Sequence, residues 1–142
     1  MRSLGLDAGE RRTGVALSDP QGLIAFPLTV IEHKDEETAI AHIARISEEH
    51  HVVRIVLGMP LMLDGHEGQQ AAKVRAFAEK LRAHVSIPVE FWDERLSTRS
   101  AQRALRESRA GRHNRNKAHV DALAASYMLQ SFLDRLRSGE ET

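Results

Sequence analysis

The chain has 142 residues, 42% hydrophobic and 28% charged, with a formal net charge of zero, which indicates one globular domain and excludes disordered and fibrous classes. The longest uncharged apolar run, Ile55–Leu63, has nine residues, about half of the ~20 that a transmembrane helix requires, so we expect no membrane span. The absence of cysteine excludes disulfides, thiolate nucleophiles and cysteine-ligated metals, and with no visible secretory signal we expect a cytoplasmic protein.

Residues 2–31 predict an antiparallel meander of three strands. Apolar residues alternate with small or polar ones in the first two strands, and turns at Gly9–Arg12 and Asp19–Gly22 separate these from a third strand, Leu23–Ile31. One face of the sheet beside Asp7 then carries only small residues: Gly5, Gly14, Ala16 and Ser18. We expect a helix to pack closely on that face.

The middle of the chain predicts two crossovers that add parallel strands to the sheet. An amphipathic helix is expected over Asp35–His50, a strand buried on both faces over Val52–Met59, a second helix over Gln69–His84 and a strand over Val89–Glu94. The segment Leu61–Gly68, between the strand Val52–Met59 and the helix Gln69–His84, is expected to form a loop.

Two helices complete the chain. The first begins at Ser97 or Thr98, whose hydroxyl can cap it, and ends near Ala110; the second spans about Lys117–Leu136. The order β-β-β-α-β-α-β-α-α predicts an α/β fold with a five-stranded mixed sheet flanked by helices. We expect one domain over residues 1–137 and a flexible tail over 138–142.

Acidic residues lie at three places that this topology brings together. Asp7 ends the first strand in a glycine-flanked segment, Asp93 and Glu94 end the last strand, and Asp121 begins an apolar stripe of the last helix. Asp7 and one of the neighbours Asp93 and Glu94 share the carboxyl edge of the sheet, since adjacent strand side chains point to opposite faces. A helix on the small-residue face brings Asp121 beside Asp7. The alternative is that Asp7 and Asp121 are turn or capping residues.

Three converging carboxylates predict a site for hard divalent cations. Oxygen ligands without cysteine favour Mg²⁺ or Mn²⁺. One ion or two can be held, and a pair about 4 Å apart can activate water and stabilise the leaving oxygen of a phosphodiester.

Four segments of the sequence carry a family resemblance. They are GLDAGERRTGVALSD at Gly5–Asp19, VLGMPL at Val56–Leu61 with the loop that follows to Gly68, DERLST at Asp93–Thr98, and DALAA at Asp121–Ala125 continuing to Gln130. In order and spacing they resemble the signature blocks of the YqgF/RuvX family, over nearly the whole chain. Two residues of the loop, Met62 and His66, depart from the family pattern.

The resemblance implies a ribonuclease H-like fold and a metal-dependent nuclease. Its acidic residues map onto Asp7, Glu94 and Asp121, with Asp93 a less certain neighbour. The implied function is 5′-end maturation of pre-16S rRNA, and the alternative within the family is resolution of Holliday junctions or other branched DNA. The partner is therefore structured RNA or branched DNA, and both stay open because the same carboxylate chemistry acts on either phosphodiester. The oligomeric state is left open.

Basic residues gather in one part of the neutral chain. Between Arg99 and His119 there are seven basic residues and one acid: Arg99, Arg103, Arg106, Arg109, Arg112, Arg115, Lys117 and Glu107. This segment favours a nucleic-acid partner over the alternative of a solvated helix face. We expect residues 109–117 to clamp the phosphate backbone without base specificity.

Further phosphate contacts are predicted near the acids. Arg11, Arg12 and Arg95 adjoin Asp7 or Glu94, and Ser97 and Thr98 offer hydroxyls at a helix N-terminus. Lys117 lies one helical turn before Asp121 and can stabilise a phosphoryl transition state or simply pair with that acid. For each arginine alone, solvation or a surface ion pair is the alternative.

Two rival functions come from other classes. The Leu6–Gly9 and Thr13–Ala16 segments also resemble the phosphate-binding hairpin of sugar-kinase and actin-type ATPases, but those proteins close two such lobes over ATP and this chain has room for one. The second rival is a non-catalytic ribosome-assembly adaptor that binds nucleic acid. The presence of all three acids argues against it.

Overall fold

The computed structural model describes residues 1–62, 64–96 and 117–139. Its strands are β1 Arg2–Ala8, β2 Arg12–Ser18, β3 Ala25–Glu32, β4 Val52–Met59 and β5 Val89–Asp93. Its helices are α1 Glu36–Glu49, α2 Gln69–Arg82, the 3₁₀ turn η1 Glu94–Leu96, and α4 Lys117–Arg137. None of these helices combines the length and apolarity that a membrane span requires. The helix predicted to end near Ala110 lies outside the described residues.

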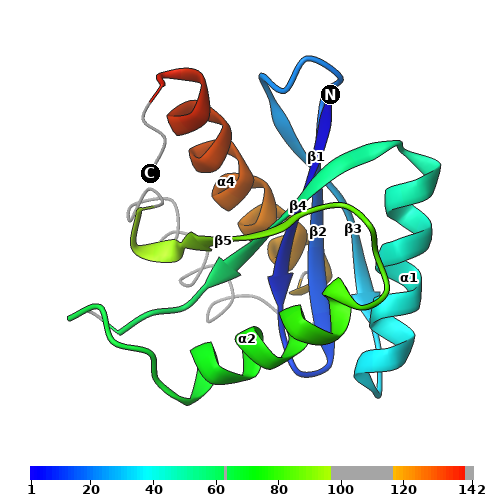
Figure 1. The fold of residues 1–142 in the computed structure, drawn as a ribbon, viewed down its shortest axis with the longest axis vertical. Helices are drawn as coiled ribbons and strands as arrows, with labels where there is room; N and C mark the ends of the chain where they lie inside the picture. The colour runs from blue at the N-terminus through cyan, green and yellow to red at the C-terminus, as the bar shows by residue number, and fades with distance from the viewer. Residues whose placement is uncertain (63, 97–116, 140–142) are drawn as a thin grey trace.

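The strands form one five-stranded sheet in the order β3-β2-β1-β4-β5. The pairs β1–β2 and β2–β3 are antiparallel, whereas β1–β4 and β4–β5 are parallel. Helices α1 and α2 cover one face of the sheet and α4 crosses the other (Figure 1). The predicted α/β fold with a five-stranded mixed sheet is confirmed.

Alternation along the central strands divides the core into two clusters. Leu4 and Leu6 of β1 are fully buried against the face that α1 and α2 cover, together with Ile55 and Leu57 of β4. The opposite cluster contains Val56 of β4 and the apolar side of α4. The sheet is therefore buried on both faces in its middle, as the apolar run in β4 predicts.

Helix α4 lies on the small-residue face, as predicted. A Cβ atom built at Gly5 would stand 2.9 Å from the Leu129 Cβ, and one at Gly14 would stand 2.2 Å from the backbone oxygen of Asp121. Both distances are too short for a real side chain, so the helix approaches the sheet closely because glycine leaves the room. The Gln130 side chain ties α4 to the sheet by accepting from the Ala25 N–H at 2.8 Å.

Three strand boundaries differ from the prediction. β3 ends at Glu32, one residue beyond Ile31, and the other two differ because an aspartate side chain binds backbone N–H groups. β3 begins at Ala25 instead of Leu23, since Asp19 Oδ1 accepts from the N–H groups of Leu23 at 2.7 Å and of Ile24 at 2.9 Å. β5 ends at Asp93 instead of Glu94, since Asp93 Oδ1 accepts from the Arg95 N–H at 3.0 Å. A side-chain-stabilised turn therefore precedes β3 and another follows β5.

The helix boundaries follow the same local chemistry. Asp35 caps α1 by accepting from the Thr38 N–H at 2.8 Å, so the helix begins one residue after the predicted start. The other end of α1 lies at Glu49, one residue before the predicted His50. α2 ends at Arg82, two residues before the predicted His84, and α4 ends at Arg137, one residue beyond Leu136.

Candidate active site

Asp7 lies in β1 between two glycine positions of the neighbouring strands. Gly14 of β2 is its direct antiparallel partner. On the other side, β1 pairs with β4 through Leu6 and Leu57, so the next step of the register places Asp7 beside Gly58. Asp7 lies two residues after Gly5 and so shares the α4 face of the sheet. Its side chain therefore has a residue without a Cβ on either flank.

Asp121 of α4 occupies the space above Gly14. The Asp121 backbone oxygen is 2.2 Å from the place of a Cβ at Gly14, and the carbonyl carbon is 2.6 Å from it. Because Gly14 and Asp7 are opposite one another across the β1–β2 ladder, their Cα atoms are about 5 Å apart. The close approach of α4 thus sets Asp121 next to Asp7.

Glu94 occupies the space above Gly58. Its Oε1 atom is 2.5 Å from the place of a Cβ at Gly58, and its Cγ and Cδ atoms are each 3.2 Å from it. Gly58 pairs with Trp92, whose ring packs edge-on against Phe132 of α4 at 5.7 Å, so this is the α4 face. One strand spacing, about 4.8 Å, separates Gly58 from the strand that carries Asp7. The turn η1 therefore folds Glu94 back toward Asp7.

The Asp121 carboxylate is held by Arg12. Arg12 Nε lies 3.2 Å from Asp121 Oδ2, and the two side chains are 33% and 15% exposed. With the side chains in this arrangement, no three His, Asp or Glu residues of the described segments are grouped to hold a metal ion. The backbone thus brings Glu94 and Asp121 toward Asp7, while the carboxylate of Asp121 pairs with Arg12.

Asp93 lies on the opposite face from Asp7 and Glu94. It pairs in register with Met59, which belongs to the core under α1 and α2. Its carboxylate accepts two-point hydrogen bonds from Arg95, from Nε at 3.0 Å and from Nη2 at 2.6 Å. The hydrogen bonds from this guanidinium lower the pKa of Asp93 below its usual value. Of the two neighbouring acids, the structure brings Glu94 and not Asp93 toward Asp7.

The remaining predicted residues divide into four groups. Arg11 and Arg12 line a groove beside the site, and Arg95 is engaged by Asp93. Ser97, Thr98, Arg109, Arg112 and Arg115 lie outside the described residues. Lys117 begins α4, but its side chain is not described.

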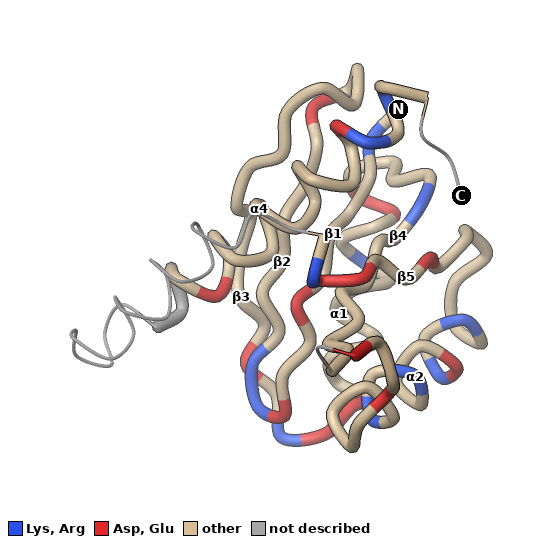
Figure 2. The backbone as a smooth tube through the Cα atoms, turned by 90° about the vertical axis from the view of Figure 1, so that its left-hand side faces the viewer, with Lys and Arg blue, Asp and Glu red and all other residues tan. Residues whose placement is uncertain are grey.

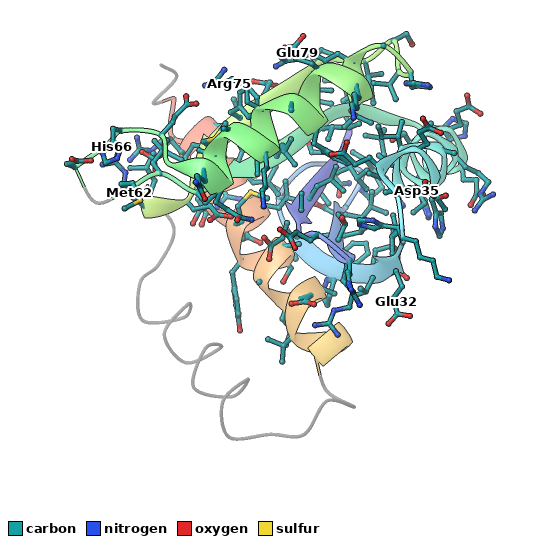
Figure 3. The ribbon with its side chains drawn as sticks, turned by 90° about the horizontal axis from the view of Figure 1, so that it is seen from below. Glu32, Asp35, Met62, His66, Arg75 and Glu79 are labelled. Atoms are coloured by element: carbon teal, nitrogen blue, oxygen red, sulfur yellow. The ribbon has the colours of Figure 1, made fainter. Side chains whose placement is uncertain are left out.

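The loop between β4 and α2 borders the Arg95 side of the site. A Cβ at Gly65 would stand 3.4 Å from an Arg95 Nη1 atom. Met62 and His66, the two departures from the family pattern, lie at the outer end of this loop, which projects from the body of the molecule (Figure 3). His66 bonds back to Asp64 through its backbone N–H at 3.1 Å and its Nδ1. These two residues therefore do not touch the three acids.

Charges of both signs meet at this end of the sheet. Lys, Arg, Asp and Glu mix in the loops at the lower end of the molecule, whereas most of the length of the inner strands carries none (Figure 2). The Arg12–Asp121 contact sets a guanidinium group beside an acidic oxygen here, which is the combination that phosphodiester chemistry requires.

The donor set fits a hard divalent cation. Carboxylate oxygens are the ligands that Mg²⁺ and Mn²⁺ prefer, and the glycine at 58 leaves the room that the Glu94 carboxylate fills. In a three-carboxylate site, Asp121 would share its carboxylate between the cation and Arg12 or release Arg12. The roles of Asp7, Glu94 and Asp121 in catalysis stay a prediction.

Sequence reasoning missed two features of the site. Gly58 seats Glu94, and the signal for it was present, because a glycine inside an apolar strand marks a close approach of another group. The Arg12–Asp121 pair joins residues 109 positions apart, and no local pattern announces it.

Comparison with known proteins places the whole chain in one family. The RuvX family model, described as Holliday junction resolvase, matches residues 1–135. A relative from Desulforudis audaxviator is 43% identical over 142 residues, covering all of both chains. Another from Symbiobacterium thermophilum is 46% identical over 134 residues, 94% of this chain and 92% of its own. Both carry the name "Putative pre-16S rRNA nuclease".

Solved structures show the same fold at low sequence identity. RuvC of Thermus thermophilus in complex with a Holliday junction substrate superposes with a TM-score of 0.64 at 15% identity, covering 98% of this chain and 96% of that one. The fowlpox virus resolvase in complex with Holliday junction DNA gives a TM-score of 0.55 at 10% identity, covering 96% of this chain and 99% of that one. The fold is thus ribonuclease H-like, as the sequence resemblance implied.

Proposed function

This chain belongs to the RuvX family, and from that premise we propose that it is a divalent-metal-dependent nuclease that hydrolyses phosphodiester bonds of nucleic acid. The observation that carries the proposal is the position of the Glu94 carboxylate above Gly58, on the same face as Asp7 and one strand away. Asp121 of α4 adds the third acid above Gly14. An acidic cluster around a glycine-lined strand end has no evident structural purpose, since like charges repel.

In the proposed mechanism, Asp7, Glu94 and Asp121 hold Mg²⁺ or Mn²⁺ through their carboxylate oxygens. When bound there, such a cation would supply activation of a water molecule and stabilisation of the leaving oxygen of the phosphodiester. The protein supplies the fixed geometry: Asp7 projects from a central strand, and Glu94 and Asp121 are set by η1 and α4. Rigid elements hold catalytic groups more accurately than loops do.

Arginine side chains beside the acids orient the substrate. Arg11 and Arg12 line the groove next to the site, and a guanidinium binds two phosphate oxygens at once. Arg95 is committed to Asp93 by two-point hydrogen bonds. Its role is therefore to fix the turn that follows β5, which sets the position of Glu94.

The proposed physiological substrate is the 5′ end of pre-16S rRNA, in the cytoplasm. The names of the relatives support this choice. Branched DNA is the second candidate, and the family's description as Holliday junction resolvase favours it. A ribosome-assembly adaptor without catalysis is a third, which the gathering of Glu94 and Asp121 at Asp7 argues against. The proposed nuclease domain covers residues 1–137.

The proposal is tested by cleavage assays with Mn²⁺ and with Mg²⁺. Labelled pre-16S RNA and a labelled four-way DNA junction are each incubated with the protein, with Asp7→Asn and with Asp134→Asn. Asp7→Asn should abolish cleavage, while Asp134→Asn, an exposed acid near the far end of α4 from Asp121, should retain most of it. The substrate that is cut more efficiently identifies the physiological class. Equal cleavage by the protein and Asp7→Asn would mean a contaminating nuclease and contradict the proposal.

A further inference from the structure

Arg12 takes part in two features of the surface at once. Its Nε atom pairs with Asp121 Oδ2 at 3.2 Å, and its side chain also lines a groove of about 620 Å³ between the β1–β2 turn and the start of α1. Arg12 is the first residue of β2, so its backbone is fixed while its side chain, one-third exposed, borders open solvent. The same guanidinium therefore stands between a candidate metal ligand and a surface groove.

The groove suits a phosphate group. Arg11, Arg12 and Lys34 contribute three positive charges to its lining, against the carboxylates of Glu32 and Asp35. Asp35 is already used as the cap of α1, where it accepts from the Thr38 N–H at 2.8 Å. Glu32 and Asp35 lie where β3 gives way to α1 (Figure 3).

A divalent cation and a guanidinium group compete for the Asp121 carboxylate. Both are positively charged, so a cation bound to Asp121 weakens the ion pair and repels Arg12. The released guanidinium can turn into the groove that it already lines, where Glu32 is its cross-strand neighbour and a bound phosphodiester would offer two oxygens to it. Binding of the cation thereby prepares the groove for the nucleic acid.

From these contacts we infer that Arg12 is a positioning residue that couples metal binding to substrate binding. Without metal it pairs with the Asp121 carboxylate; with metal it turns to the groove and binds a phosphate of the nucleic acid. The inference rests on the proposed function, since it requires a cation at Asp121. It predicts that metal and nucleic acid bind cooperatively. A bound cation frees Arg12 from Asp121 for the phosphate, and a bound phosphate draws Arg12 from Asp121 and leaves that carboxylate to the cation.

The size of the effect follows from the exposure of the pair. A partly exposed ion pair reduces the affinity of a competing cation by about 2- to 5-fold. Arg12→Gln should therefore bind Mn²⁺ about 2- to 5-fold more tightly than the unaltered protein. Arg11→Gln is the matched control, because Arg11 has the same charge, adjoins Arg12 and lines the same groove, while the ion pair with Asp121 is made by Arg12.

The test has two measurements on the full chain. Calorimetric titration with Mn²⁺ alone gives the metal affinity of the protein, Arg12→Gln, Arg11→Gln and Asp7→Asn, after circular dichroism has shown each to be folded. Fluorescence anisotropy then gives the affinity for a labelled RNA hairpin with and without Mn²⁺, with the RNA checked for integrity by gel electrophoresis. Arg12→Gln should reduce the ratio of the two RNA affinities by about 2- to 5-fold. Arg11→Gln should weaken RNA binding but keep the ratio.

The outcomes separate this inference from the proposed function. If Mn²⁺ binds the protein, is lost in Asp7→Asn, and binds Arg12→Gln no more tightly, the coupling is refuted while the metal site stands. The coupling is also refuted if Arg11→Gln tightens Mn²⁺ binding as much as Arg12→Gln, because the effect is then one of general charge. If the unaltered protein binds no Mn²⁺, the proposed function and the coupling fail together.

Discussion

Replacing Gly58 by alanine tests whether the Glu94 carboxylate must lie where the structure places it. The added Cβ would stand 2.5 Å from Glu94 Oε1, whereas ordinary contact begins at 3.4 Å, so the carboxylate must move by about 0.9 Å. A catalytic group displaced by about 1 Å can lose 10²-fold in rate. We therefore expect Gly58→Ala to cleave RNA and branched DNA about 10²-fold more slowly.

The same substitution should leave the fold largely intact. The three atoms that the Cβ meets all belong to the Glu94 side chain, which can rotate away. Alanine in place of glycine also restricts the unfolded chain, which stabilises a protein by about 0.4–1 kcal/mol where the backbone permits it. Urea denaturation should therefore give Gly58→Ala a free energy of unfolding within about 1 kcal/mol of the unaltered protein.

Gly14→Ala is the matched control for this experiment. Its Cβ would meet the Asp121 backbone at 2.2 Å, so the whole of α4 must shift. Overpacking of this kind costs about 1–3 kcal/mol or more. Both stability and activity should fall in Gly14→Ala, because α4 carries Asp121, whereas activity alone should fall in Gly58→Ala. Full activity in a folded Gly58→Ala protein would refute the claim that Glu94 acts from its place above Gly58.

Three further predictions concern stability, pH and salt. Leu129→Ala removes a fully buried side chain of α4 and should lower the free energy of unfolding by about 2–5 kcal/mol in urea denaturation. A loss as small as that caused by substituting an exposed residue of α4 would show that Leu129 is not packed against the sheet. Because Arg95 lowers the pKa of Asp93, their pair should stabilise the fold fully above pH 3.8, the ordinary pKa of an aspartate, and lose this effect as the pH falls through the lowered pKa. The difference in unfolding free energy between the unaltered protein and Arg95→Gln should therefore shrink over that pH range. A difference that stays constant with pH would exclude the ion pair as its cause. Replacing Arg112 and Arg115 together by Gln should reduce the slope of log K against log salt by about 1.8 for duplex DNA, and an unchanged slope would remove both from the interface.

The sequence predicted the architecture because its signals are local. Alternation marked β1 and β2, and the apolar run Val52–Met59 marked β4 to the residue. The small-residue face anticipated the packing of α4, since a helix can approach closely only where side chains are absent. The start of β3 and the end of β5 were misplaced because in each case an aspartate side chain binds a backbone N–H group that the strand pattern assigns to the sheet.

The candidate site was predicted less completely because it depends on side-chain pairing across the fold. Strand alternation predicted that only one of Asp93 and Glu94 could face Asp7. It did not predict which of the two, since that depends on the register of β5 against β4. Arg95 was expected to meet phosphate, and the structure pairs it with Asp93. The Arg12–Asp121 pair exists only once α4 lies on β2.

The proposed mechanism depends most on one divalent-cation site shared by three distant acids, and anomalous diffraction from Mn²⁺-soaked crystals tests it directly. The mechanism predicts a manganese peak in contact with carboxylate oxygens of Asp7 and Glu94, with Asp121 turned from Arg12 to join them. A peak at Asp93 on the opposite face, or no ordered manganese near Asp7 at saturating concentration, would contradict it.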